Sequence, residues 1–186
     1  VLTDSYYALR LPNVVGPWTL SPTSLVSHDF DNCMETAWFN GTASNVTVSG
    51  FTTRTHSIGV NLGTSTSGFV VEDIDDASRS VNGMGIGIAG TNHVVRDVKV
   101  RHRSNGIVVA NPTTNSQLSG LDVRGAGTAL RIDAASPTNT YADLALDYNN
   151  IGLNLRGPVG TSAMTPYVFD GDAIGHVSLV GNLVAL

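Results

Sequence analysis

The sequence repeats a short pattern at nearly constant intervals, and this repeat limits the chain to a stacked architecture. In each copy an apolar residue is followed by one linker residue, then by Gly or Asp, then by a second apolar residue. The last apolar positions of the five copies are 23, 24, 23 and 23 residues apart. A period of this length is typical of solenoids, in which each repeat packs only against its neighbours. The copies are Val48-Ser49-Gly50-Phe51, Val71-Glu72-Asp73-Ile74, Val95-Arg96-Asp97-Val98, Leu118-Ser119-Gly120-Leu121 and Tyr141-Ala142-Asp143-Leu144.

A second apolar signal follows in every repeat, for example Gly106-Ile107-Val108-Val109, and both signals have the periodicity of β-strands. Apolar and polar residues alternate with a period of two, as in strands with one buried face. Bends are expected at the Gly or Asp of the first signal, because these residues tolerate left-handed backbone. Each repeat should hold about three short strands, with repeats stacked about 4.8 Å apart. Two interior columns are expected, one of Phe51, Ile74, Val98, Leu121 and Leu144, the other of Val60, Ile86, Ile107, Leu130 and Leu153.

These corners and strands resemble the right-handed parallel β-helix, the solenoid of pectate-lyase-like enzymes and of many bacteriophage tail and capsid proteins. The resemblance covers roughly residues 22–157 and concerns the fold, without assigning functional residues. It implies an all-β, single-stranded right-handed parallel β-helix. We expect about six to seven coils of about 23 residues each.

The ends of the chain depart from the repeat and are expected to cover the terminal coils, because an open last coil exposes an unpaired edge. Residues 1–21 are predicted to form an N-terminal cap or arm. A degenerate coil should follow, with its corner at Asp29-Phe30 and its third strand at 37–40. Residues 158–186 are predicted to hold a last imperfect coil, in which Ile174-Gly175-His176 echoes the repeat, and a C-terminal cap.

The composition excludes several classes of protein. Only 13% of the residues are charged, with a single lysine, whereas an ordinary soluble domain has about 25%. This composition argues against a helical bundle, whose surface usually carries many Lys and Glu residues. A net charge of −5 argues against a nucleic-acid partner. Cys33 is alone, so no intrachain disulfide or cysteine metal site is expected. No apolar run is long enough for a membrane helix and no signal peptide is apparent, so neither is expected.

Four charged residues are the fallback catalytic candidates if the protein is an enzyme. Asp75 and Asp122 lie two coils apart on one outward column, about 10 Å by strand spacing. That is near the upper end of the roughly 6.5–9.5 Å separation of the carboxylates in inverting glycosidases. A lyase would instead use Arg101 or Arg124 as its base. Lys99 falls between the two aspartates, so the favoured interpretation is an alternating salt-bridged ladder on a solvated face.

Metal and cofactor sites are not expected. The run from Glu72 to Asp76 holds four carboxylates in five residues and could attract a hard cation, but alternation distributes them over both faces of a strand. Asp170-Gly171-Asp172 is too short for a calcium loop and indicates a turn. The five histidines share neither a column nor a ligand spacing.

Apolar and small residues on the outward columns indicate an interface. Val70 and Val94 are neighbours on the first-strand column, and Val108 and Ala110 lie on the third-strand column. Columns of this kind are easily desolvated and suit packing against protein, although β-branched residues also simply favour strands. The N-terminal arm adds the aromatic anchors Tyr6, Tyr7 and Trp18.

These observations lead to the hypothesis of a non-enzymatic structural virion protein. Coil lengths are nearly uniform, so little chain remains for the walls of a substrate groove, and no aromatic platform for sugars is evident. Short, lysine-poor β-helices resemble phage virion components, which commonly form trimers. We therefore expect a homotrimeric capsid decoration (cement) protein on the surface of a phage-like shell, with itself and a major capsid or other virion protein as partners. The alternative is a tailspike or receptor-binding β-helix that binds or cleaves host polysaccharide, as a polysaccharide lyase or glycoside hydrolase.

Overall fold

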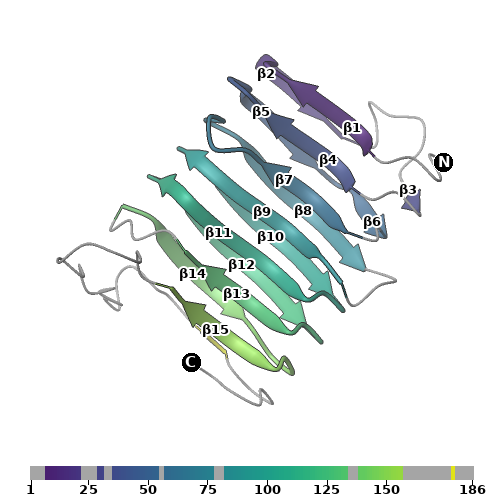
Figure 1. The fold of residues 1–186 in the computed structure, drawn as a ribbon, viewed down its shortest axis with the longest axis vertical. Coiled ribbons are helices and arrows are strands. Elements are labelled where there is room, and N and C mark those ends of the chain that lie inside the picture. The colour runs from purple at the N-terminus through teal and green to yellow at the C-terminus, as the bar shows by residue number, and fades with distance from the viewer. Residues whose placement is uncertain are drawn as a thin grey trace.

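A computed structural model shows that the protein is a solenoid of parallel strands (Figure 1). The structure describes residues 7–21, 29–31, 35–54, 57–77, 82–133, 138–156 and 177–178, and these contain strands and turns but no helix. The strands form two sheets, seen as two layers in Figure 1. One sheet has the order β1 (Tyr7–Pro12), β4 (Glu35–Asn40), β7 (Ile58–Leu62), β9 (Met84–Thr91), β11 (Asn105–Thr114), β13 (Thr128–Ile132) and β15 (Ile151–Leu155).

The second sheet is bent along its length, because most of its strands contain a corner of the repeat. Its order is β16 (Val177–Ser178), β14 (Thr140–Ala145), β12 (Gln117–Arg124), β10 (Val94–Arg101), β8 (Val70–Ala77), β5 (Ser44–Ser49) and β2 (Val15–Leu20). Two short strands lie beside this path, β3 (Asp29–Asp31) and β6 (Thr52–Arg54), which pair with each other.

The predicted all-β parallel solenoid is confirmed, with about 23 residues per turn. Within the described residues the solenoid makes roughly five turns, and the sheet from β1 to β15 stacks seven strands, against the six to seven coils expected. Of these ends, residues 22–28, 32–34 and 157–176 lie outside the described part of the chain.

Both predicted interior columns are confirmed. In β10, Val98 pairs with Ile74 on one side and with Leu121 on the other. In β11, Ile107 pairs with Ile86 and Leu130 in the same way. All ten predicted core residues are at most 5% exposed. The apolar core therefore runs unbroken through the stacked turns.

The terminal turns follow the expectation only in part. The strand at 37–40 is confirmed, since β4 pairs with β7 in the expected register, Ala37 opposite Val60. Asp29 lies opposite Thr52, two residues beyond the expected corner, so the degenerate coil is offset. The described part of 1–21 forms β1 and β2, which extend both sheets by pairing with β4 and β5. The segment Ile174–His176 lies outside the described residues.

The predicted corners are confirmed by their backbone conformation. Gly50, Asp73, Asp97, Gly120 and Asp143 all have φ between 52° and 74°, the left-handed region. This conformation turns the chain inside an otherwise continuous strand without breaking the ladder on either side.

Two further columns of left-handed residues, which were not predicted from the sequence, complete the corners of each turn. One precedes the first strand and consists mostly of Asn, and the other follows the second strand. Their members are Asn45, Gly68, Asn92 and Asn115 in the first, and His102, Gly125 and Tyr148 in the second.

Asp97→Val is expected to destabilise the fold by roughly 1–3 kcal/mol, because a β-branched residue is strained at the φ of +54° found there. Asp97→Gly is the matched control, since Gly50 and Gly120 occupy the same corner in other turns, and it should be tolerated. Urea unfolding measures both. Equal destabilisation by the two variants would contradict the role assigned to this corner.

Buried backbone N–H groups near one corner are satisfied by side chains of the next turn. The Phe69 amide donates to Nδ1 of His93 at 3.2 Å, and the His93 amide donates to the Ser116 hydroxyl at 3.2 Å. The Ser116 amide in turn donates to Oδ1 of Asn139 at 3.0 Å. These acceptor side chains are 0–5% exposed. An unpaired buried amide is costly, so this polar ladder supports the turns where the sheets do not continue.

His93 is held in its neutral form by this ladder. Its Nδ1 accepts a hydrogen bond from an amide, so the ring proton resides on Nε2, which donates to the Ala89 carbonyl at 2.9 Å. Burial lowers the pKa of His93 from 6.5 to about 4, against the opposing effect of the bond to Ala89. Protonation would turn the acceptor that serves Phe69 into a second donor.

The stability of the protein is therefore expected to fall as the pH drops from 6.5 towards 4, because in this window the unfolded chain binds a proton at His93 that the folded chain does not. The loss at this site should approach about 3 kcal/mol near the lower pH. His93→Asn, which copies Asn139 of a later turn, can still accept from the Phe69 amide and should lack this component. Urea unfolding across the pH range compares the two, and identical pH profiles would contradict the assignment.

Candidate functional site

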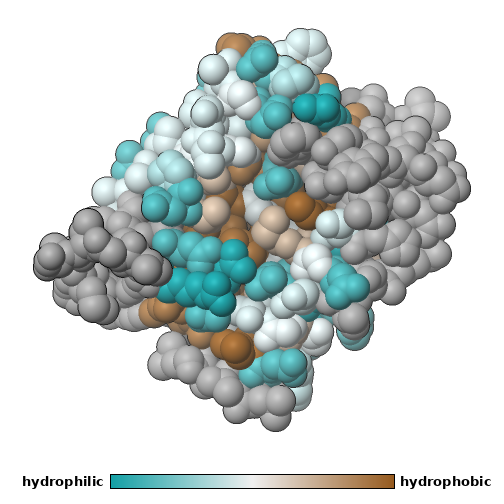
Figure 2. Space-filling model, viewed as in Figure 1, coloured by the Kyte–Doolittle hydropathy of each residue, from teal (hydrophilic) through white to brown (hydrophobic). Residues whose placement is uncertain are grey.

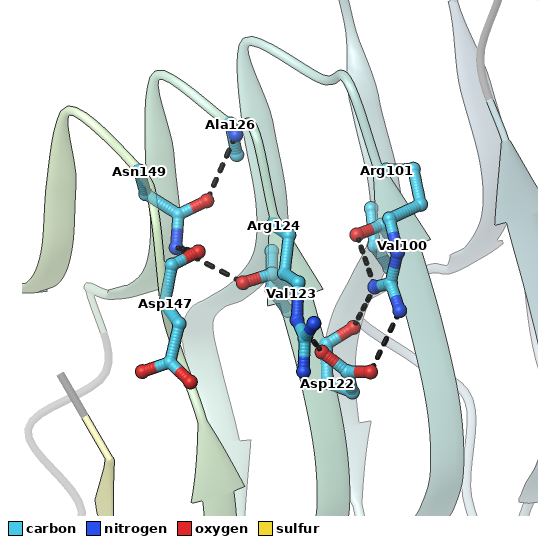
Figure 3. A network of polar contacts seen from close by, with 8 residues as sticks. All are labelled: Val100, Arg101, Asp122, Val123, Arg124, Ala126, Asp147 and Asn149. Carbon is cyan, nitrogen blue, oxygen red and sulfur yellow. Dashed lines mark hydrogen bonds and ion pairs between the residues drawn. The ribbon is translucent and has the colours of Figure 1, made fainter. Parts of the chain in front are cut away.

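Three of the four fallback catalytic residues meet on the outward face of the second sheet (Figure 3). Arg101, at the end of β10, donates from Nη2 to the Asp122 carboxylate of β12 at 2.6 Å. Its Nη1 also donates to the Asp122 carbonyl at 2.7 Å. Arg124 donates from Nε to the other carboxylate oxygen of Asp122 at 2.9 Å. The Asp122 carboxylate therefore accepts hydrogen bonds from two guanidinium groups, that of Arg101 on the preceding turn and that of Arg124 on its own strand.

This arrangement makes the cluster an ion-paired clamp between two turns. Both oxygens of Asp122 accept charge-assisted hydrogen bonds, and the Arg101 guanidinium is fixed to a carboxylate and to two carbonyls, those of Asp122 and Val100. A general base needs a free lone pair that faces the substrate. Here each Asp122 oxygen accepts from an arginine and keeps one further lone pair, so the arrangement favours a structural role without occupying the carboxylate completely.

Asp75 does not join this cluster, and the expected alternating ladder is not formed. Lys99 lies opposite both Asp75 and Asp122 in the sheet, as predicted. The ion pairs of Asp122 nevertheless go to Arg101 and Arg124. The reason is geometric: the Arg101 guanidinium reaches across to Asp122 and binds its carboxylate and its carbonyl together. Asp75 is exposed on the far side of Lys99.

A second ion pair, which was not predicted from the sequence, lies inside the solenoid. The side chains of Asp76 and Arg103 are both 0% exposed. Arg103 binds Asp76 in a bidentate manner, with Nε to Oδ2 and Nη2 to Oδ1 both at 2.7 Å. Its Nη1 donates to the Ser57 carbonyl at 3.2 Å, and the Thr53 hydroxyl donates to Asp76. The alternation that turns Ile74 inward also turns Asp76 inward, which was the available signal.

The acidic run from Glu72 to Asp76 is dispersed by these contacts. Glu72 accepts from Nε of Arg96 at 2.7 Å, Asp73 lies at the corner, and Asp76 is inside. Among the described residues no three carboxylate, His or Cys side chains gather as metal ligands. Asp170 and Asp172 lie outside the described residues.

Asp76→Asn is expected to destabilise the protein by roughly 3–5 kcal/mol, because it leaves the buried charge of Arg103 without its counter-ion. Asp122→Asn makes the same chemical change at the partly exposed clamp and should cost about 0–1 kcal/mol. Urea unfolding measures both free energies. Equal losses would show that burial does not separate the two pairs.

The predicted interface residues differ in what they offer. Val70 and Val94 are adjacent in register on β8 and β10, and both are half-buried and face outward. The face drawn in Figure 2 shows apolar residues in brown between pale and teal polar ones. Trp18, on β2, is 59% exposed. Only the backbone of Tyr7 is described, within β1, and Tyr6 lies outside the described residues.

The third-strand column provides less apolar surface than expected. Ala110 is half-buried, but Val108 is only 4% exposed. Val108 lies between Gly87 and Arg131 in the sheet. The terminal methyl of Met84 lies 2.5 Å from where a Cβ of Gly87 would stand, so this long side chain fills the space above the glycine. Long side chains on both flanks thus leave Val108 little free area.

No protein-family model, no curated protein and no solved structure matches this chain. Within the described residues, no helix has the length and apolarity needed to cross a membrane. The function must therefore be inferred from the surfaces themselves.

Proposed function

We propose that the protein is a non-enzymatic structural component of a virion, a homotrimeric decoration (cement) protein that stabilises a phage-like shell. The proposal rests above all on the ion pairs that many of the outward charges form within the chain. Glu72 pairs with Arg96, Arg131 with Asp133, and Asp122 with both Arg101 and Arg124. Each such pair lowers the number of free charges that must be desolvated on assembly, which favours packing against protein.

The same ion pairs favour a rigid building block over an adaptable binding loop. Glu72–Arg96 and Arg101–Asp122 each connect consecutive turns, and the buried Asp76–Arg103 pair does so inside. A stiff element loses little conformational entropy when it assembles. This property suits a protein that reinforces a shell.

Two outward-facing apolar sites suggest where the protein would contact its own copies and the shell. The half-buried Val70 and Val94 lie side by side on a flat sheet face, which closed rotational symmetry can bury repeatedly. Val15 and Trp18, 61% and 59% exposed, lie together on β2 at the N-terminal end of the solenoid. We assign the first site to the trimer contact and the second to the shell.

The positions of the four fallback catalytic residues support catalysis less well than a structural role. Asp122 and Arg101 are committed to each other, and Asp75 stands apart from them. A polysaccharide lyase or glycoside hydrolase would need two acid–base groups facing one open space.

Val94→Glu is expected to convert the trimer to monomers while leaving far-UV circular dichroism unchanged, because it places an unpaired charge in the proposed contact. Lys99→Gln is the matched control, since it also lowers the net charge by one unit but lies beyond the Asp97 corner of the same strand. Native mass by light scattering measures assembly, and co-sedimentation with the purified particle measures shell binding.

A wild-type protein that stays monomeric at micromolar concentration and binds no particle would refute this function. Cleavage of a polysaccharide by the native protein, abolished by Asp75→Ala or Asp122→Ala in a folded variant, would establish the enzymatic alternative instead.

A further inference from the structure

One turn of the solenoid is shorter than its neighbours at a single corner. Ile88 pairs with Val109, and Gly90 pairs with Thr113. The two residues of β9 are two positions apart, whereas their partners in β11 are four apart, so β11 carries two additional residues, Asn111 and Pro112. The connection from β7 to β8 is also longer than the one after β9. Val60 pairs with Ile86 and Ser67 with Thr91, so seven positions of the earlier turn match five of the later one. The turn at Ala89–Gly90 therefore leaves a notch between two longer turns.

This notch is an open groove of about 330 Å³. Its floor is Gly90, and its walls are the segment 64–67 on one side and Pro112 with Thr114 on the other. Gly90 has φ of +102°, and a Cβ there would stand 2.2 Å from the Thr66 carbonyl oxygen. The floor thus admits only glycine. The volume is at the lower end of the roughly 300–1,000 Å³ of small-ligand sites.

Most residues that line the notch bear a hydroxyl group. Thr64, Ser65, Ser67, Thr91 and Thr114 all border it, and among the residues that the structure describes no charged or aromatic side chain does. The hydroxyls of Thr91 and Thr114 bind each other at 3.0 Å and retain further capacity, because each hydroxyl donates once and accepts twice. Within the described chain the hydroxyls of Thr64, Ser65 and Ser67 make no hydrogen bond.

We propose that this notch binds one or two sugar units of a neutral glycan. A row of hydroxyls both donates and accepts, which is also the hydrogen-bonding character of a neutral sugar. The groove is open to solvent at the corner of the solenoid, so a longer chain can pass over it while one segment enters. The notch lies across a corner from the Val70–Val94 face, since Ser67 and Thr91 are three residues along the chain from those valines. Sugar binding there goes beyond the proposed structural role and does not depend on it.

Other ligand classes fit the notch less well. An anion is usually held by Lys or Arg and a hard cation by carboxylates, and neither kind of side chain is among the described residues that line the notch. An added peptide strand needs an open sheet edge and side-chain pockets, whereas Thr91 and Thr114 already pair with each other in the sheet. The net charge of −5 further disfavours acidic polysaccharides.

The experiment titrates the intact protein with neutral oligosaccharides, hexose and N-acetylhexosamine oligomers, and with an oligouronate as the charged comparison. Amide and methyl chemical shifts in NMR spectra report binding at each residue. Neutral oligomers at millimolar concentration should shift the signals of Ser67, Thr91 and Thr114, and the oligouronate should not. The combined Thr91→Val and Thr114→Val variant keeps the side-chain shape and should weaken binding about tenfold or more.

Thr140→Val is the matched control, because Thr140 is an exposed strand threonine outside the notch, and it should bind as the wild type does. A second variant inserts Asn-Pro after Ala89, which copies the neighbouring turn, fills the notch and should abolish binding. Several outcomes overturn the proposal: no shifts with any neutral oligomer, shifts elsewhere on the protein, or a notch variant that loses only its binding to the particle. The last outcome would make the notch a contact for a protein partner.

Discussion

The structure depends on hydrogen bonding between successive turns in a fixed register. Each strand of the solenoid satisfies its backbone through strands of the preceding and following turns, as β10 does through residues 24 positions before it and 23 positions after it. That ladder is interrupted at the corners, where the chain changes direction. Left-handed residues such as Asp97 and Gly120 make the change within a strand, and side chains such as Ser116 and Asn139 satisfy the amides that lose their partners.

The same register decides what the charged residues do. Stacking brings side chains of consecutive turns about 4.8 Å apart, so an acid and a base on one column meet without any loop to position them. Arg96 pairs in this way with Glu72, which lies directly opposite it. Arg101 lies two residues beyond the position opposite Asp122, and Arg103 lies three residues beyond the position opposite Asp76, so these pairs depend on the length of the arginine side chain. The ion pairs therefore reinforce the stack that creates them.

The sequence predicted the features that recur in every turn. It missed those that depend on an atypical corner residue or on how far a long side chain extends. Apolar columns such as that of Val98 and Gly/Asp corners recur in every turn, so a period of about 23 residues reveals them. The corner at Tyr148 escaped prediction because a bulky aromatic residue gives no signal for left-handed backbone. Arg103 escaped because its partner is 27 residues away and a turn earlier. The burial of Val108 escaped because it depends on the path of a flexible neighbour, Met84.

The departures from the repeat are where a particular function can arise, because a perfectly regular stack offers the same surface at every turn. The shortened turn at Gly90 is such a departure, and the interior has adapted to it. His93 occupies the column in which Ser116 and Asn139 stand in later turns, and its ring reaches the Ala89 carbonyl at 2.9 Å. The ring also approaches the Thr66 hydroxyl, at 3.4 Å. A large neutral side chain thus supports the floor of the notch from within. The irregular surface feature therefore rests on the same packed interior as the regular strands around it.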